Sequence, residues 1–340
     1  MKRGIFNLIT EIEAYRETPK DWFITLDHST VFWYGLLKRE GELTTNISFK
    51  EYIIDYLKNL KKAVETNLEK RFIYFICSRK KVRFNINKKP FYNPITKNLT
   101  IHMIIGKNKK IKVKTKFFDC DFVKYVNPNI KLSEVFISFQ KEINNTIIMS
   151  IHDFLLEFNI NIGIETVIHY VGKTKNPHTR PTNSVHAGLS NVLYNIPTEE
   201  EDVFLYFNTF KVITEVENNA YGLNFITTNS LTDEIDVENE ADIIEKAFIL
   251  YFDSEIQYEN RIKENKEFKN NLIKLTNNNN IRSLQIFYEM RGTSEYWKFS
   301  SSAINKNYRH IFTFKIDNNQ LIFEKDSSIY NYYNSRGSLG

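Results

Sequence analysis

The stretch HYVGKTKNPHTRP, residues 169–181, gathers a glycine, two lysines and an arginine directly after the apolar run IGIETVI. The overlapping segment GIETVIHYVG is rich in β-branched and aromatic residues and predicts a strand. Downstream, VHAGLSNVLYN predicts a short helix and DVFLYFNTFKVITEV predicts a second strand. The order of strand, polar loop, helix and strand predicts a mixed α/β fold for this part of the chain.

Other elements are predicted on both sides of this stretch. The segment DEIDVENEADIIEKAFILYF, residues 233–252, predicts a helix, because acidic residues ahead of a helix complement its N-terminal dipole. SFKEYIIDYLKNLKKAVETNLEK has a helical pattern, and HIFTFKIDNNQLIFEKD predicts a hairpin with a DNN turn. Apolar residues spaced by three and four in LSEVFISFQKEINNTIIMSIHDFLLEF predict one long amphipathic helix.

Composition indicates a folded protein and excludes several classes. The chain has 340 residues, of which 42% are hydrophobic and 14% aromatic, enough for a substantial core. Cys77 and Cys120 lie far apart without zinc or disulfide spacing, so we expect reduced, buried thiols. No run of eighteen apolar residues and no leader with a small-residue cleavage site is present, so we expect a soluble cytoplasmic protein with no membrane partner.

The formal net charge of +5 hides a strongly basic tract. No acidic residue occurs between Glu69 and Asp119, whereas lysines and arginines are frequent there, and RFIYFICSRKKVRFNI and LTIHMIIGKNKKIKVKTKFF both have strand-like patterns. A folded basic surface attracts polyanions, since neutralising phosphates releases condensed counterions. The predicted nucleic-acid-binding residues are Lys80, Lys81, Arg83, Lys109, Lys110 and Lys112. The alternative is that these lysines only decorate solvent-exposed faces.

The sequence therefore predicts a chain of several parts. They are a basic α/β region over 1–130, a long connecting helix over 131–158, an α/β domain over 159–265, a strand-rich extension over 266–334 and a flexible tail over 335–340.

Four ordered features resemble the GIY-YIG nuclease superfamily. Residues 170–174, YVGKT, are similar to the second half-motif of that family and its continuation. Arg180 follows Tyr170 by ten residues, a spacing like that of the family's arginine, and His186 begins an H-x-x-L pattern. EADIIEKAFILYF resembles the family's glutamate-bearing helix and makes Glu245 the matching residue. The resemblance covers roughly residues 160–260 and implies a small central sheet flanked by helices.

The first half-motif, Gly-Ile-Tyr, is the clear departure from this resemblance. The family places it on a neighbouring strand about ten residues upstream, where FLLEFNINIGIE offers no tyrosine. Tyr74, in the strand-like run RFIYFICS, takes that place if residues 80–160 are an insertion. The remaining alternatives are that this tyrosine is dispensable or that the domain has lost a catalytic part.

The resemblance implies hydrolysis of phosphodiester bonds with a divalent cation, Mg²⁺ or Mn²⁺. Glu245 would be the metal ligand, and Arg180 would bind the phosphate oxygens through its planar donors. Tyr170 would act as general base or orient the water. An ordinary tyrosine is a poor base at neutral pH, so Lys173 would be needed to favour the phenolate. His186 would assist proton transfer or contact phosphate.

Function and partners follow from the same resemblance. It implies an endonuclease acting on DNA rather than RNA, in restriction or another defence against phage DNA. An RNase or toxin with the same site, and a non-catalytic nucleic-acid-binding protein on a decayed nuclease fold, are the alternatives. A homodimer would let one site per chain cut both strands of a duplex, and a partner from a defence system is the other expected protein partner.

Overall fold

The computed structural model describes most of the chain. The described residues are 2–38, 48–116, 129–142, 145–182, 187–218, 223–290 and 292–325. Cys120, His186 and the predicted tail over 335–340 lie outside them.

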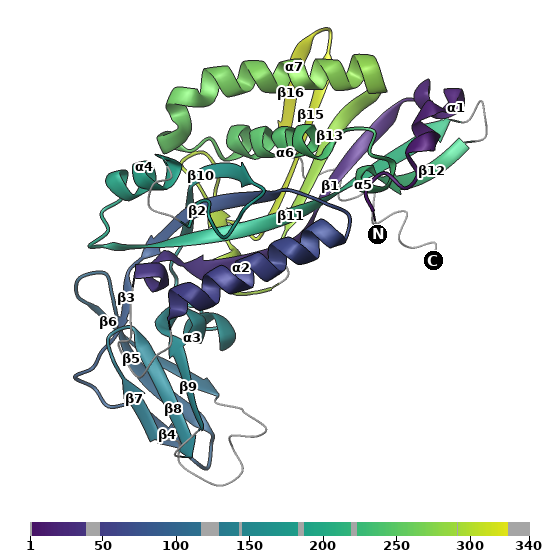
Figure 1. Ribbon diagram of the computed structural model, residues 1–340. Coiled ribbons are helices and arrows are strands. Elements are labelled where there is room, and N and C mark those ends of the chain that lie inside the picture. Colours follow the sequence, from purple (N-terminus) through teal and green to yellow (C-terminus); the bar gives the residue numbers. More distant parts are fainter. Residues whose placement is uncertain are drawn as a thin grey trace.

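A nine-stranded mixed sheet forms the body of the protein (Figure 1). In spatial order its strands are β14 (Phe299–Ser300), β10 (Thr166–Thr174), β2 (Phe72–Lys80), β11 (Glu201–Asn218), β1 (Lys20–Trp33), β13 (Ile281–Glu289), β15 (Arg309–Asp317) and β16 (Gln320–Lys325), while β12 (Leu223–Thr228) pairs with β11. The pairs β14–β10 and β1–β13 are parallel and the others antiparallel. Strand β2 is buried on both faces except at Lys80, which explains its nearly continuous apolar sequence.

Helices cover both faces of this sheet. Helices α6 (Val237–Phe252) and α7 (Arg261–Asn279) lie on one face, and α2 (Phe49–Thr66) lies on the other (Figure 1). The shorter helices are α1 (Glu13–Arg16), α3 (Ile151–Glu157), α4 (Ala187–Asn195) and α5 (Asn229–Thr232), with 3₁₀ helices η1 (Asn7–Glu11), η2 (Tyr34–Lys38), η3 (Glu255–Asn260) and η4 (Glu295–Trp297). None of the helices in the described residues is long and apolar enough to cross a lipid bilayer.

Local sequence signals account for several of these elements. The Asp236 side chain caps α6 by accepting hydrogen bonds from the backbone N–H groups of Glu238 and Asn239, at 2.9 and 3.1 Å. The predicted β15–β16 hairpin is confirmed, and its turn residues Asn318 and Asn319 both have positive φ, as two-residue hairpin turns require. Cys77 is buried in β2, as predicted.

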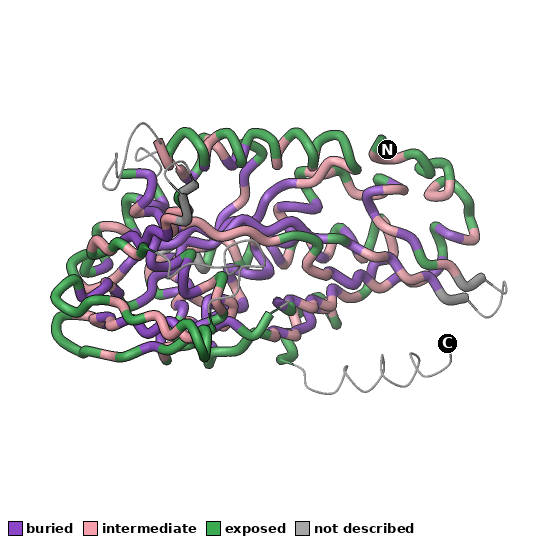
Figure 2. Tube along the Cα trace, turned by 90° about the horizontal axis from the view of Figure 1, so that it is seen from below, coloured by how far each residue is buried: buried purple, intermediate pink, exposed green. Residues whose placement is uncertain are grey.

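A second unit, which we call the arm, projects from the body between β2 and β10 (Figure 1). It comprises the described residues between 82 and 150. One arm sheet contains β3 (Val82–Phe84), β4 (Phe91–Asn93), β5 (Asn98–Ile105) and β6 (Lys109–Lys116), and the other contains β7 (Asn129–Leu132), β8 (Phe136–Glu142) and β9 (Asn145–Ser150). Figure 2 shows that buried residues run through the middle of the molecule, whereas exposed ones are frequent on the arm.

The long amphipathic helix predicted over 131–158 is wrong. Residues of that segment form the β8–β9 hairpin, and only α3 is helical. Both faces of β8 are buried at Phe136, Ile137, Ser138 and Phe139, so its apolar residues do not alternate. A strand buried on both faces gives no period of two, and its apolar spacing can then imitate that of a helix.

The predicted boundaries do not separate structural units. Strands β2, β10 and β13 come from the regions predicted as 1–130, 159–265 and 266–334, yet they share one sheet. The body is therefore a single nine-stranded sheet instead of the small sheet that was predicted, and the arm is an excursion between two of its neighbouring strands. The segment predicted as a strand-rich extension begins inside α7.

A buried ion pair fixes the loop that leads into β10. Glu295 in η4 accepts hydrogen bonds at one carboxylate oxygen from the backbone N–H groups of Ile162, Gly163 and Ile164, at 2.9, 2.8 and 3.2 Å. Its other oxygen pairs with Arg79 of β2, and both side chains are buried. Arg79 also donates to the Thr166 hydroxyl at 2.7 Å, so these contacts tie the start of β10 to β2.

Candidate active site

Two tyrosines lie side by side on neighbouring strands of the body. Strand β2 runs antiparallel to β10, and Tyr74 lies directly opposite Gly172. The rings of Tyr74 and Tyr170 stack with centroids 6.0 Å apart and an interplanar angle of 20°. A Cβ atom at Gly172 would collide with the Tyr74 ring and lie 2.8 Å from Cε1 of Tyr170. The glycine of the YVG motif therefore leaves the space that both rings occupy.

The outer edge of β10 is held by side chains that follow α6. The register of β10 against β2 shifts between Ile168 and Tyr170, so a bulge falls at His169. Beyond the bulge, the Gln257 side chain accepts a hydrogen bond from the Val171 N–H at 2.8 Å and donates one to the Val171 carbonyl at 2.7 Å. Ser254 donates to the His169 carbonyl. These contacts fix the backbone on both sides of Tyr170.

Helix α6 brings Glu245 to the same region. The side chain is partly buried. Its negative charge raises the pKa of both Tyr74 and Tyr170, so it interacts electrostatically with both rings. Burial raises the pKa of Glu245 itself to about 7, with Asp242 and Glu264 adding to the rise and Lys173 opposing it. The surroundings therefore disfavour an isolated negative charge on this carboxyl and would favour a bound cation.

Lys173 makes a different contact from the one predicted. Its Nζ atom lies 2.8 Å from Oδ1 of Asp242. The other carboxylate oxygen of Asp242 accepts hydrogen bonds from Lys246 at 2.6 Å and from Asn271 at 3.2 Å. The predicted lowering of the Tyr170 pKa by Lys173 is not found: that pKa is raised, chiefly by burial and then by Glu245. Lys173 instead ties the end of β10 to α6.

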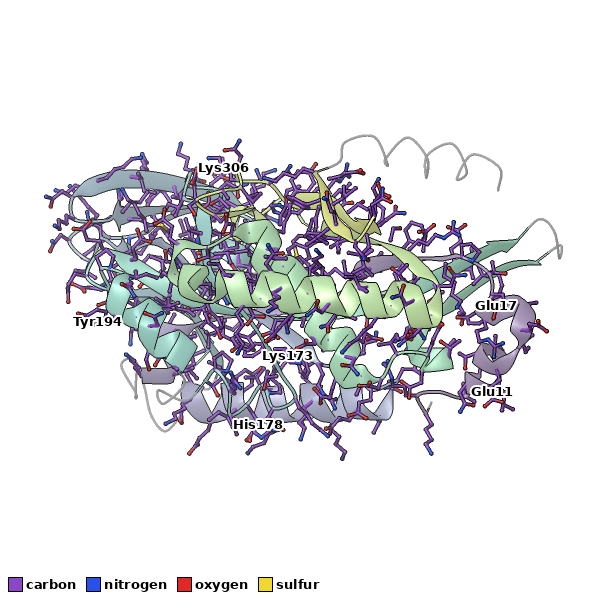
Figure 3. All side chains as sticks on the ribbon, turned by 90° about the horizontal axis from the view of Figure 1, so that it is seen from above. Glu11, Glu17, Lys173, His178, Tyr194 and Lys306 are labelled. Atoms are coloured by element: carbon purple, nitrogen blue, oxygen red, sulfur yellow. The ribbon has the colours of Figure 1, made fainter. Side chains whose placement is uncertain are left out.

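Arg180 interacts electrostatically with the tyrosine pair. Its side chain is exposed, and its charge lowers the pKa of both Tyr74 and Tyr170, opposing the effect of burial. The hydrogen bond between the two tyrosines raises the pKa of Tyr74 and lowers that of Tyr170. The pKa of the neighbouring His178 is lowered by burial and then by the charges of Lys61 and Lys58 on α2. Figure 3 shows His178 close to α2 and Lys173 nearer to the long helix α7.

The structure thus brings Tyr74 and Glu245, which are distant in the sequence, into one electrostatic cluster with Tyr170 and Arg180. Lys173 binds Asp242, and both residues affect the pKa of Glu245. His186 lies outside the described residues. Asp242 and Glu264 were missed. Glu264 is on α7, whose polar, Asn-rich sequence has too weak an apolar stripe to have marked it as a helix facing the site.

The donors present suit a hydrated hard cation. Within the described ranges no group of three or more His, Cys, Asp or Glu side chains is arranged to hold a metal ion. Mg²⁺ commonly keeps several waters and binds through one or two carboxylates. Glu245, a desolvated carboxyl with Glu264 nearby, meets that requirement, whereas a caged metal site of several protein ligands is not available there.

The residues predicted to bind nucleic acid fall into two groups. Arg83 pairs with Asp202 of β11 at 2.8 and 3.0 Å and so fastens the arm to the body. Lys81, just before the arm, donates to the Thr198 carbonyl at 2.7 Å. The remaining four are exposed to solvent: Lys80, Lys109, Lys110 and Lys112. Arg71 and Arg79 of the same basic tract are buried in ion pairs.

Comparison of the chain with protein-family models, with curated proteins and with solved structures found no match. The resemblance to GIY-YIG nucleases therefore rests on the motif residues of the sequence.

Proposed function

We propose that the protein is a metal-dependent endonuclease that hydrolyses phosphodiester bonds of DNA, in restriction or another defence against phage. The observation that carries the proposal is the stacked Tyr74–Tyr170 pair over Gly172, coupled electrostatically to Arg180 and Glu245. In this proposal Tyr74 is the counterpart of the first half-motif tyrosine, and the arm is an insertion between the two half-motifs.

Each side chain has a role that its surroundings favour. Arg180 is exposed and presents a planar donor set to the non-bridging oxygens of the attacked phosphate. Tyr170 is partly buried and has a raised pKa, so we assign its hydroxyl to orienting the attacking water by a hydrogen bond and not to removing its proton as a phenolate. Tyr74 has no accessible surface, so we assign it to positioning Tyr170 through the hydrogen bond between the two side chains. Gly172 keeps both rings in place.

Glu245 would hold the metal ion. A bound Mg²⁺ would neutralise charge on the phosphate and on the leaving oxygen. The raised pKa of Glu245 means that a proton competes with the cation below about pH 7. Lys173 and Asp242 keep the end of β10 against α6, so the tyrosine pair and Glu245 stay on facing elements.

The test is cleavage of plasmid DNA and, separately, of a structured RNA in Mg²⁺, Mn²⁺ or EDTA. We expect metal-dependent cutting of DNA by the wild type, lost in Glu245→Ala and in Arg180→Ala. Glu255→Ala and Arg282→Ala, which change exposed residues of the same types, serve as controls and should cut normally. Cutting of RNA alone would replace DNA by RNA in the proposal. Cutting that both site variants retain would overturn the assignment of the site.

A further inference from the structure

The arm carries a groove that the proposed site does not use. It has a volume of about 510 Å³ and lies between β4, an edge strand of one arm sheet, and β7, an edge strand of the other. Its lining residues are Ile86, Lys88, Lys89, Pro90, Phe91, Tyr92, Ile130 and Leu132. None of these lining residues is acidic.

The floor and the rim of this groove differ in character. Tyr92, Ile130 and Leu132 are partly buried and pack against the core, so the floor is fixed. Phe91 on the rim leaves 62% of its surface exposed, so its ring is open to a ligand. Lys88 and Lys89 are also exposed, and neither forms an ion pair with another residue in the described part of the chain.

We propose that this groove binds an unpaired segment of DNA, with a base stacked on Phe91 and its phosphates beside Lys88 and Lys89. Lysines can bind the phosphates of a DNA duplex, but the base faces of a duplex are stacked on one another and cannot reach an aromatic side chain. An exposed aromatic ring beside two exposed lysines matches a single strand, whose base faces are free to stack and whose backbone is anionic. The pocket is large enough for one nucleotide.

The position of the arm relates this groove to the proposed site. Lys80, at the base of the arm, follows Tyr74 by six residues along β2, a distance of about 20 Å at roughly 3.3 Å per residue. A strand held in the groove would therefore reach the tyrosine pair only if it continued for several nucleotides. The inference rests on the proposed function in one respect, because it assigns the groove to the same DNA substrate.

The test measures binding without cleavage. Fluorescence anisotropy in EDTA would compare a labelled dT15 strand with a labelled 15-base-pair duplex, for the wild type, Phe91→Ala and Ile95→Ala. Base stacking on an aromatic side chain contributes about 1–3 kcal/mol, so we expect Phe91→Ala to weaken dT15 binding by at least about fivefold. Ile95 is 90% exposed on the same hairpin and outside the groove, so its variant should bind as the wild type does.

A second variant separates charge from stacking. Replacing both Lys88 and Lys89 by Gln should reduce the salt dependence of dT15 binding by about 1.4 in the slope of log K against log salt, whereas Phe91→Ala should leave the slope unchanged. Wild-type affinity for dT15 in Phe91→Ala, or an equal loss for the duplex, would overturn the inference. That outcome would leave the nuclease proposal standing, because cleavage is measured separately. A protein that binds dT15 through Phe91 and never cuts would instead overturn the nuclease proposal alone.

Discussion

Replacing the candidate metal ligand should make the metal-free protein more stable. The pKa of Glu245 rises from 4.5 to about 7 in the folded protein, chiefly because of burial. At 1.36 kcal/mol per pH unit, ionisation of this carboxyl therefore costs the fold about 3 kcal/mol at pH 8. Glu245→Gln removes the charge and nearly keeps the shape, so it should raise the free energy of unfolding by about that amount.

The sign of the effect depends on pH. A raised folded-state pKa means that the unfolded chain loses its proton first as the pH rises, so wild-type stability falls between about pH 4.5 and pH 7 and is then constant. Glu245→Gln should therefore match the wild type within about 1 kcal/mol at pH 5 and exceed it by about 3 kcal/mol at pH 8.

Urea unfolding at pH 5 and pH 8 in EDTA measures this difference. Glu255→Gln, at an exposed position, should show no such dependence on pH. The reasoning about the site would be refuted if Glu245→Gln were less stable than the wild type at pH 8, or if its effect were the same at both values. Saturating Mg²⁺ should remove the advantage of the variant, because only the wild type can gain stability by binding the ion.

Three further outcomes are expected. Gly172→Ala forces Tyr74 and Tyr170 apart, so the rate of plasmid cleavage should fall by about 100-fold, and differential scanning calorimetry should show a loss of about 1–3 kcal/mol in stability. Glu295→Ala removes the carboxylate that pairs with the buried Arg79 guanidinium and accepts from three backbone N–H groups, so urea unfolding should show a loss of about 3–5 kcal/mol in the free energy of unfolding. An unchanged unfolding midpoint would show that the buried pair contributes nothing. At limiting Mg²⁺, the wild-type cleavage rate should rise with pH up to about 7 and level off above it, because the Glu245 carboxylate forms only as the pH passes its raised pKa. A cleavage rate that falls over this range would contradict the role of the Glu245 carboxylate as metal ligand.

Local chemistry explains which elements could be predicted. The start of α6 was predicted from acidic residues ahead of an apolar run, and Asp236 caps it. The turn at Asn318 and Asn319 was predicted from the residues that tolerate positive φ. In each case the deciding interaction spans fewer than about five residues, so the sequence pattern contains it.

Interactions across long separations could not be predicted in the same way. Nothing local to β2 marks its pairing with β10, because register depends on the whole sheet, and Tyr74 was therefore only one of several alternatives. The contact between Lys173 and Asp242 depends equally on how α6 packs on β10. The hairpin of β8 and β9 was missed for another reason, since its burial on both faces hides the period of two.

The most direct test of the tyrosine pair as the centre of a nuclease site is the metal-dependent cleavage rate of Tyr74→Phe on supercoiled plasmid. Tyr74 has no accessible surface and its ring remains in the variant, so only the hydroxyl is lost. We expect a fall of about 100-fold or more, with stability lowered by only about 1 kcal/mol for the lost hydrogen bond, while Tyr288→Phe, at another buried tyrosine of the same sheet, should cut as the wild type does. Wild-type cutting by Tyr74→Phe would contradict the account, because the hydroxyl that meets Tyr170 would then have no part in the reaction.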